Sequence, residues 1–406
     1  MKLGLLGRKL GHSYSPAIHA MLGDPGYGLY EAEPEALGEF LKSGSFDGLN
    51  VTIPYKKAVL PYLSRMDENA ERLGNVNTVV REPDGSLTGY NTDFFGFSEL
   101  LRFSGFDVSG QKVLVLGTGG ASETVRAVLE DEGAEVIRIS RTGENNYENL
   151  GNHADARFLV NATPVGMYPG NLRSPVEIGQ LPNLRGVIDL IYNPARTKLM
   201  LDAEGLGIPA FNGLRMLAAQ AVQASEFFHR TKIDPAKIDE IHRKLRFRME
   251  NLILVGMAGC GKTAVGQLIA QKTGKIFVDS DAEIEALAGK SIPAIFTEDG
   301  EDRFRDLETQ VLERLGKGSR QVIATGGGCV TKARNYAPLH QNGTLIWLRR
   351  DPRLLPTSGR PLSMKTAPEV LYRKRLPLYE AFSDLAIEND RTPEEAAESI
   401  LKEVSP

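Results

Sequence analysis

The chain has 406 residues, a formal net charge of −4 at pH 7, and 25% charged and 41% hydrophobic residues. Because one hydrophobic core rarely serves so long a chain, two or three domains are expected. The charge balance argues against a nucleic-acid partner, and no apolar run reaches membrane-spanning length, so no membrane association is predicted. Only two cysteines are present, which suits a reducing compartment and predicts a cytoplasmic protein.

The first predicted elements alternate short apolar runs with polar loops. Residues 2–6 form a predicted strand, followed by the loop Gly11-His12-Ser13-Tyr14-Ser15-Pro16 and a helix from about Ala17. The two serines of this loop can bind the oxygens of a ligand or cap the helix, and the residues alone leave both interpretations open.

A second strand is predicted in Leu49-Asn50-Val51-Thr52-Ile53-Pro54-Tyr55-Lys56, where apolar residues alternate until Pro54. Because a proline ends a strand, Thr52 and Lys56 are placed at the exit of this one. Two polar segments follow, Gly74-Asn75-Val76-Asn77-Thr78 and Gly89-Tyr90-Asn91-Thr92-Asp93. Each of them, taken alone, is equally typical of a turn.

Together, in this order and spacing, these segments closely resemble the substrate domain of shikimate dehydrogenases. The resemblance implies that Lys56 and Asp93 form the catalytic pair. It also implies four binding residues for the hydroxyls and the carboxylate of shikimate, namely Ser13, Ser15, Thr52 and Asn77. The residue types agree, because reducing a ring ketone needs a proton donor beside the oxygen as hydride arrives, and a Lys–Asp pair supplies one.

A dinucleotide-binding unit is predicted next. A strand at residues 111–116 leads into Gly117-Thr118-Gly119-Gly120-Ala121-Ser122 and a helix, and a second strand at 135–139 completes the β-α-β pattern. After that strand come Ser140-Arg141-Thr142, where an NAD site usually carries an acidic residue. An arginine suits a 2′-phosphate instead, so the sequence predicts NADP(H) bound by these two loops.

Later motifs extend the resemblance over about residues 1–245. They are Asn161-Ala162-Thr163-Pro164-Val165-Gly166-Met167, Asp189-Leu190-Ile191-Tyr192-Asn193-Pro194 and Asn212-Gly213-Leu214-Arg215-Met216-Leu217. The resemblance implies substrate contacts from Tyr192 and Gln220 and a cofactor contact from Gly213. Two positions depart from the family pattern: Ser122 replaces the third glycine, and Asn145 stands where a second basic residue is often found.

The run Gly256-Met257-Ala258-Gly259-Cys260-Gly261-Lys262-Thr263 fits G-x-x-x-x-G-K-[ST], the loop that wraps nucleotide phosphates. It lies between an apolar run at 252–255 and a helical run that begins at Ala264. Backbone N–H groups from Gly259 to Ala264 are therefore predicted to bind phosphates, with Lys262 reaching the outer ones and the Thr263 hydroxyl binding Mg²⁺.

Three further segments follow the phosphate loop. A strand predicted at 276–281 ends in Asp279 and Asp281, which fit a Mg²⁺ ligand and a hydroxyl-binding acid, or else an acidic strand cap. Residues 300–308, with Arg305, are predicted to be helical. A strand at 322–324 leads into Gly326-Gly327-Gly328, which indicates close approach of the backbone to a ligand.

With Gly359-Arg360-Pro361-Leu362 and Tyr372-Arg373-Lys374-Arg375-Leu376-Pro377-Leu378-Tyr379, these segments closely resemble shikimate kinase over about residues 249–406. The resemblance implies that Asp281 orients and deprotonates the accepting hydroxyl and that Arg305 and Arg375 clamp the substrate carboxylate. Gly326–Gly328 would pack against the ring, and Arg360 would lie on a lid over ATP. The segment from Trp347 to Arg360 is shorter than the family's usual lid region.

The predicted fold is α/β throughout. Residues 1–248 are expected to form an α/β substrate domain (1–93 with helices at 213–245) and an NADP-binding Rossmann domain (94–212), ending in a charged helix and linker. Residues 249–406 are expected to form a P-loop domain like the nucleoside monophosphate kinases, with a central parallel sheet.

The two resemblances name consecutive reactions: NADPH-dependent reduction of 3-dehydroshikimate to shikimate, and phosphorylation of shikimate by Mg-ATP. Two alternatives stay open. One half can be a binding or regulatory module, or the first half can act on quinate with NAD. No oligomeric state is predicted, and oxidation of Cys260 and Cys329, both in glycine-rich loops, is a hypothesis for inactivating the kinase.

Overall fold

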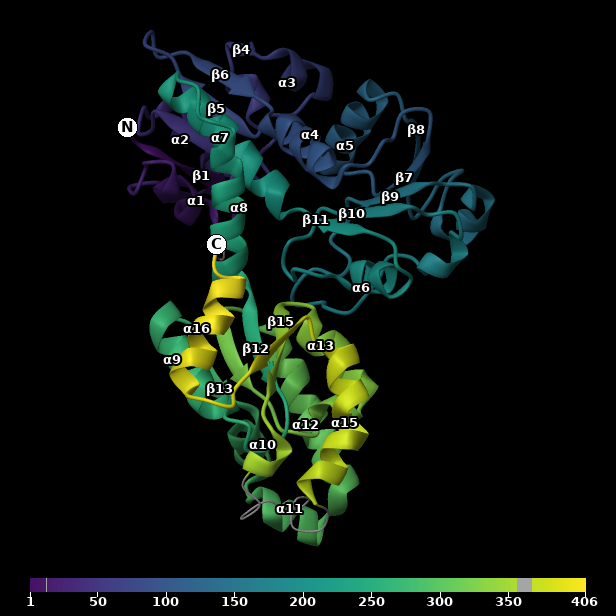
Figure 1. Ribbon diagram of the computed structural model, residues 1–406. Helices are drawn as coiled ribbons and strands as arrows, with labels where there is room; N and C mark the ends of the chain where they lie inside the picture. Colours follow the sequence, from purple (N-terminus) through teal and green to yellow (C-terminus); the bar gives the residue numbers. More distant parts are fainter. Residues whose placement is uncertain (12, 356–366) are drawn as a thin grey trace. The chain divides into compact units, whose positions relative to one another are not determined.

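A computed structural model describes residues 1–11, 13–355 and 367–406 (Figure 1). The chain divides into two compact units: residues 1–165, 175–192 and 202–245 form the first, and residues 166–174, 193–201 and 246–406 form the second. The division lies close to the predicted boundary between residues 248 and 249. It differs in two short segments, 166–174 and 193–201, which fall in the predicted Rossmann domain but are grouped with the second unit.

The N-terminal part of the first unit is built on a six-stranded sheet with the order β2-β1-β3-β5-β6-β4. β1 is parallel to β2 and β3, whereas β5 is antiparallel to β3 and β6. The strands are β1 (Leu3–Gly7), β2 (Gly28–Glu31), β3 (Gly48–Val51), β4 (Arg65–Met66), β5 (Thr78–Arg81) and β6 (Leu87–Tyr90). The helices are α1 (Ser15–Met21), α2 (Leu37–Lys42) and α3 (Glu68–Leu73), with short 3-10 turns η1 (Pro34–Ala36) and η2 (Leu60–Tyr62).

A five-stranded, wholly parallel sheet with the order β11-β10-β9-β7-β8 follows in the same unit. The sheet's strands are β7 (Lys112–Leu116), β8 (Glu135–Ile139), β9 (Phe158–Asn161), β10 (Gly186–Asp189) and β11 (Ala210–Asn212). Helices α5 (Gly120–Asp131) and α6 (Lys198–Gly205) follow strands of this sheet, with η3 (Tyr147–His153) and η4 (Ile178–Gln180). Helix α7 (Leu214–His229) instead packs on α4 (Thr92–Ser104), α1 and β5, beside the six-stranded sheet. Strand β7 is buried from Val113 to Leu116, as the apolar run at 111–116 predicts.

The second unit contains a parallel sheet with the order β13-β14-β12-β15-β16. Its strands are β12 (Asn251–Val255), β13 (Ile276–Asp279), β14 (Gln321–Ala324), β15 (Gly343–Arg349) and β16 (Leu385–Glu388). Helices α9 and α16 lie on one side of this sheet, and α12, α13 and α15 lie on the other (Figure 1). The predicted α/β class with parallel sheets is therefore confirmed.

Every residue of the central strand β12 is buried, because helices cover both faces of the sheet. The helices are α9 (Lys262–Thr273), α10 (Ser280–Ala288), α11 (Ile292–Glu298), α12 (Gly300–Lys317), α13 (Tyr336–His340), α15 (Pro368–Phe382) and α16 (Pro393–Val404). Short 3-10 turns are η5 (Cys329–Thr331), η6 (Ala333–Asn335) and η7 (Pro352–Leu354). None of the helices in the described part of the chain is long and apolar enough to cross a membrane.

The charged segment after Asp234 forms one helix, α8 (Ala236–Met249), which spans the division at residue 245. The side chain of Asp234 accepts a hydrogen bond from the Ala236 N–H at 2.9 Å and so starts this helix. At the other end, the Lys275 ammonium donates to the backbone carbonyls of Phe247 and Glu250. A cation at these otherwise unpaired carbonyls stabilises the helix C-terminus, although burial lowers the pKa of Lys275 to about 8.

Candidate active sites

Five of the predicted dehydrogenase residues come from segments at one edge of the six-stranded sheet. Ser13 and Ser15 follow β1, and Thr52 directly follows β3, its parallel neighbour. Asn77 directly precedes β5 and Asp93 follows β6, and the antiparallel pairing brings these positions to the same edge. The backbone confirms the register, because the Thr52 N–H donates to the Leu6 carbonyl at 2.9 Å.

Lys56 and Asp93 form an ion pair between Nζ and Oδ2. Their side chains are 26% and 14% exposed, so the pair is shielded but reachable. Asp93 is held in the first turn of α4, where the Asn91 side chain caps the helix by accepting from the Phe94 N–H at 3.2 Å. The polar segment that resembles a turn is therefore a helix start, and an ammonium paired in this way can donate a proton to a carbonyl oxygen.

Asn77 and Gln220 are linked through Thr92. The Asn77 side-chain amide donates to the Thr92 hydroxyl at 3.0 Å and accepts from the Thr92 N–H at 2.7 Å. The Thr92 hydroxyl lies 3.4 Å from Gln220 Oε1, and Gln220 Nε2 donates to the Leu217 carbonyl at 3.0 Å. Because Asp93 is the next residue after Thr92, this network connects the predicted binding groups to the predicted catalytic pair.

Tyr192 follows β10 in the parallel sheet and lies against the serine loop. Its ring centroid is 6.1 Å from that of Tyr14, with an edge-on angle of 72°. Tyr14 stands between the two predicted serines, and the Ser15 N–H donates to the Ser13 hydroxyl at 3.1 Å. Burial raises the pKa of Tyr192, so its hydroxyl stays protonated and can donate to a substrate oxygen.

The glycine loop after β7 has the geometry of an anion-binding helix start. Gly119 is the residue before α5, and a Cβ atom at Gly119 or Gly120 would meet no side chain or distant backbone atom of the described residues within 4 Å. Thr118 is exposed and Ala121 is half-buried beside them. Open backbone at a helix N-terminus suits a pyrophosphate.

Two departures from the family pattern in this cofactor region have local explanations. The buried Ser122 hydroxyl donates to the Gly117 carbonyl at 2.7 Å, so serine supplies a bond where a third glycine is usual. Asn145, at the position of the family's second basic residue, lies 3.0 Å from His153 Nε2 through its Oδ1.

Ser140, Arg141 and Thr142 follow β8, at the same edge of the parallel sheet as the glycine loop. The Ser140 hydroxyl donates to the Thr142 carbonyl and shapes this turn, while Arg141 is exposed. Gly213 directly follows β11, and a Cβ there would lie 2.6 Å from the Leu190 carbonyl carbon. The backbone at Gly213 therefore requires glycine for packing, whatever it binds.

The phosphate loop of the second unit joins β12 to α9, and three of its glycines have positive φ: 142° at Gly256, 85° at Gly259 and 100° at Gly261. These conformations favour glycine. Lys262 is buried, and its ammonium donates to the carbonyls of Gly256 and Met257 at 2.8 and 2.9 Å. Cys260 is fully buried, and the first turn of α9 places the Thr263 and Ala264 N–H groups at the helix start.

Thr263 and Asp279 form the candidate metal site. The Thr263 hydroxyl donates to Asp279 Oδ2 at 3.0 Å, so two oxygen groups that suit Mg²⁺ are adjacent. Within the part of the chain that the structure describes, no cluster of three acidic, histidine or cysteine side chains could hold a metal. A Mg²⁺ ion that keeps several waters needs only one or two protein ligands, and Thr263 with Asp279 fits that requirement.

The prediction that Asp281 lies on the same strand as Asp279 is wrong. β13 ends at Asp279, which becomes the N-cap of α10 and accepts a hydrogen bond from the Asp281 N–H at 3.0 Å. The capping bond turns the chain into a helix before Asp281, so the two carboxylates are separated by a change of direction. Burial raises the pKa of Asp281, and the neighbouring Asp279 charge acts in the same direction.

The three glycines after β14 bring the predicted kinase groups together. A Cβ at Gly326 would lie 2.8 Å from Asp281 Oδ1, one at Gly327 would lie 2.7 Å from the Ala258 nitrogen, and one at Gly328 would lie 2.5 Å from Arg305 Nη1. The backbone can lie this close to the three groups only because Gly326, Gly327 and Gly328 lack side chains. Each glycine thus faces a different functional group: an acid, the phosphate loop and an arginine.

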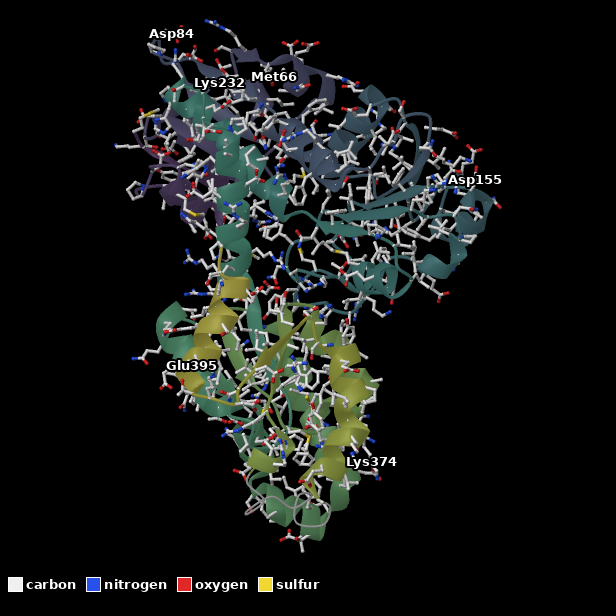
Figure 2. All side chains as sticks on the ribbon, in the orientation of Figure 1. Met66, Asp84, Asp155, Lys232, Lys374 and Glu395 are labelled. Carbon is white, nitrogen blue, oxygen red and sulfur yellow. The ribbon has the colours of Figure 1, made fainter. Side chains whose placement is uncertain are left out.

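Both predicted arginine ligands lie at this glycine loop. Arg305 is 4% exposed and donates to Glu308 Oε2 at 2.9 Å, and Arg375 donates to the Gly327 carbonyl at 3.0 Å. Lys374, one residue earlier on α15, instead points away from the body of the unit (Figure 2). Two guanidinium groups at one loop can bind a carboxylate. Arg360 lies outside the described residues, as does much of the predicted lid.

Thr92 and Glu308 contact predicted site residues but were not themselves predicted. Glu308 is fully buried, and among the described residues its Oε1 has no hydrogen-bond partner, as is also true of Asp281 Oδ1. Burial raises the pKa of Glu308, while Arg305 acts in the opposite direction. The signals were present: Thr92 adjoins Asp93, and Glu308 is three residues after Arg305, a spacing that places both on one face of a helix.

The hypothesis of oxidative inactivation finds no structural support. Cys260 and Cys329 are both fully buried. Burial raises the pKa of the Cys329 thiol to about 12, which suppresses the thiolate that oxidants attack.

Comparison with known families accounts for both units. A family model described as the shikimate dehydrogenase substrate binding domain matches residues 5–79, and one described as shikimate kinase matches residues 258–405. The shikimate dehydrogenase (NADP(+)) of Clostridium perfringens strain 13 is 34% identical over 271 residues, covering 61% of this chain and 100% of that protein.

Two solved structures resemble the first unit. Shikimate 5-dehydrogenase of Thermus thermophilus in complex with NADP(H) and shikimate has a TM-score of 0.55 and 34% identity, covering 60% of this chain and 99% of that one. Quinate dehydrogenase of Corynebacterium glutamicum in complex with NAD has a TM-score of 0.53 and 29% identity, covering 59% and 98%. The chain belongs to the shikimate dehydrogenase family and carries a shikimate kinase domain after it, as a bifunctional enzyme of the shikimate pathway.

Proposed function

We propose that the first unit reduces 3-dehydroshikimate to shikimate with NADPH, and that the second phosphorylates shikimate with Mg-ATP. The observation that carries the first assignment is the Lys56–Asp93 pair joined through Thr92 to Asn77 and Gln220. The observation that carries the second is the convergence of Asp281, Arg305 and Arg375 on the glycine loop beside the phosphate loop.

In the redox step, NADPH supplies the hydride that goes to the carbonyl carbon. Lys56 Nζ donates a proton to the carbonyl oxygen, and the Asp93 carboxylate orients the ammonium and balances its charge. Six side chains bind the hydroxyls and the carboxylate of the ring: Ser13, Ser15, Thr52, Asn77, Tyr192 and Gln220. Arg141 at the end of β8 favours the 2′-phosphate of NADP over NAD.

In the kinase step, Mg-ATP supplies the phosphoryl group. Asp281 accepts the proton of the attacking hydroxyl, and a pKa raised by burial makes it a better base than an exposed aspartate. Arg305 and Arg375 clamp the ring carboxylate, and Lys262 with Thr263 and Asp279 neutralises charge on the phosphate side. Positioning and charge neutralisation are what phosphoryl transfer chiefly requires.

The test is a coupled assay on the full chain with 3-dehydroshikimate, NADPH and Mg-ATP, in which phosphorylated shikimate is the expected product. Shikimate without phosphorylation at millimolar ATP would contradict the kinase assignment and favour a binding module. Reversing the first reaction with quinate or shikimate, and NAD or NADP, addresses the remaining alternative. Faster turnover of quinate with NAD would overturn the proposed substrate and cofactor.

A further inference from the structure

Gly327 is the point where the two sides of the kinase site meet. A Cβ at this residue would lie 2.7 Å from the Ala258 nitrogen and 3.3 Å from the Gly256 carbonyl oxygen, both in the phosphate loop. Its neighbours Gly326 and Gly328 face Asp281 and Arg305. A displacement of Gly327 would therefore disturb the nucleotide side and the substrate side together.

The Gly327 carbonyl oxygen accepts two hydrogen bonds, both from α15. Arg375 Nη1 donates at 3.0 Å and the Tyr379 hydroxyl donates at 2.5 Å. Arg375 and Tyr379 are four residues apart on one helix, so both face the loop Gly326–Gly328. A carbonyl oxygen has two lone pairs, and both lone pairs of the Gly327 oxygen accept a hydrogen bond.

The packing around Tyr379 holds its hydroxyl in one position as a hydrogen-bond donor. Its side chain is fully buried, its ring stacks on Trp347 at 5.6 Å with an angle of 14°, and its hydroxyl lies 3.7 Å from the Met257 sulfur in the phosphate loop. Burial raises the pKa of the phenol far above its ordinary value, so the hydroxyl keeps its proton. The ring cannot turn away without breaking this packing.

This inference rests on the proposed kinase function, in which Arg375 binds the substrate carboxylate. To bind that carboxylate, the Arg375 guanidinium must direct some of its N–H groups toward the substrate. The hydrogen bond from Arg375 to the Gly327 carbonyl would then become weaker. We propose that Tyr379 is a positioning residue of the kinase site: its hydroxyl holds the Gly327 carbonyl in place and so frees Arg375 to bind the substrate carboxylate.

The experiment is a double-mutant cycle on the full chain with Tyr379→Phe, Arg375→Ala and the pair. Tyr379→Phe keeps the ring and removes only the hydroxyl, so the KM for shikimate is expected to rise about tenfold, the scale of one lost buried hydrogen bond. The KM for ATP should stay within about twofold. In the Arg375→Ala background the same change leaves the Gly327 carbonyl with neither donor from α15, so it is expected to raise the KM for ATP as well, because Gly327 packs against the phosphate loop.

Tyr372→Phe is the matched control, since Tyr372 lies on the same helix and is half-buried, and it should leave both KM values unchanged. Equal and additive effects in the two backgrounds would overturn the proposal, because they would mean a merely structural tyrosine. An unchanged shikimate KM in Tyr379→Phe would overturn it as well.

A second measurement tests the proposal even if Tyr379→Phe does not fold. If Tyr379 alone can hold the loop, Arg375→Ala must leave the KM for ATP near the wild-type value, and a large rise would contradict the proposal. Failure of the kinase assignment itself would appear separately, as a wild-type chain that does not phosphorylate shikimate.

Discussion

The two candidate sites differ in how completely their polar groups are paired with one another. In the dehydrogenase site the predicted groups hydrogen-bond to one another: Lys56 to Asp93, and Asn77 and Gln220 to Thr92. In the kinase site two buried acceptors, Asp281 Oδ1 and Glu308 Oε1, have no hydrogen-bond partner within the part of the chain that the structure describes.

This difference follows from the chemistry each site is proposed to perform. A general acid must be held beside the oxygen that receives its proton, and the ion pair with Asp93 holds the Lys56 ammonium in one position. A general base must attract a proton, and burial beside another carboxylate favours that. In the kinase site, the hydroxyls of a bound substrate can donate to these two acceptors.

The sharpest test of independent sites is Lys262→Ala. Removing a cation that stabilises a transferring phosphoryl group is expected to slow phosphorylation by about 10³–10⁵-fold while leaving the redox rate unchanged. Lys272→Ala, an exposed position on the same helix, is the control and should retain both activities. Loss of the redox activity in Lys262→Ala would contradict independent sites.

Lys56→Ala tests the ion-paired site in the same way. Loss of the general acid is expected to reduce dehydroshikimate reduction by about 10²–10⁴-fold, measured by NADPH absorbance, with phosphorylation of added shikimate unaffected. The neighbouring Lys57 is exposed, and Lys57→Ala should behave as the wild type. A redox rate that survives in Lys56→Ala would remove Lys56 from the mechanism.

Arg375→Ala sharpens the comparison on the binding side. A hydrogen bond to a charged group contributes about 1.5–3 kcal/mol, so the KM for shikimate in the kinase reaction should rise about 10- to 100-fold. Lys374→Ala removes an outward-pointing charge from the adjacent position (Figure 2) and should change neither KM. An equal rise in both variants would indicate a general charge effect instead of a clamp.

The last expected effect concerns stability instead of activity. Burial, with the Arg196 charge, lowers the pKa of His340 from 6.5 to about 3. Between these values the unfolded chain binds a proton that the folded unit does not. The free energy of unfolding should therefore fall as the pH drops below 6.5, by up to about 1.4 kcal/mol per pH unit.

Urea unfolding followed by tryptophan fluorescence measures this in the second unit alone, because Trp347 is the only tryptophan of the chain. His340→Gln should reduce the slope of stability against pH between about pH 6.5 and pH 3. An unchanged slope would mean that other groups set the acid sensitivity of this unit.

Local sequence patterns were enough to predict several secondary-structure elements and the family of each half of the chain. Strand–glycine–helix sequences predicted β7 with α5 and β12 with α9 within a few residues, because the period of apolar residues and the conformations of glycine are local properties. The motif order also indicated both families, and with them the residue types at each site. These inferences need no knowledge of which segments meet.

Only the tertiary structure decided how those residues work together. The helix start at Asp279 separated it from Asp281, Thr92 proved to connect Asn77 with Gln220, and Tyr379 proved to donate to the Gly327 carbonyl. The partners of Thr92 and Tyr379 are distant in sequence, and a buried carboxylate or hydroxyl takes its pKa from all of its surroundings. Sequence specifies which groups are available, whereas packing specifies which of them share a proton, a carbonyl or a charge.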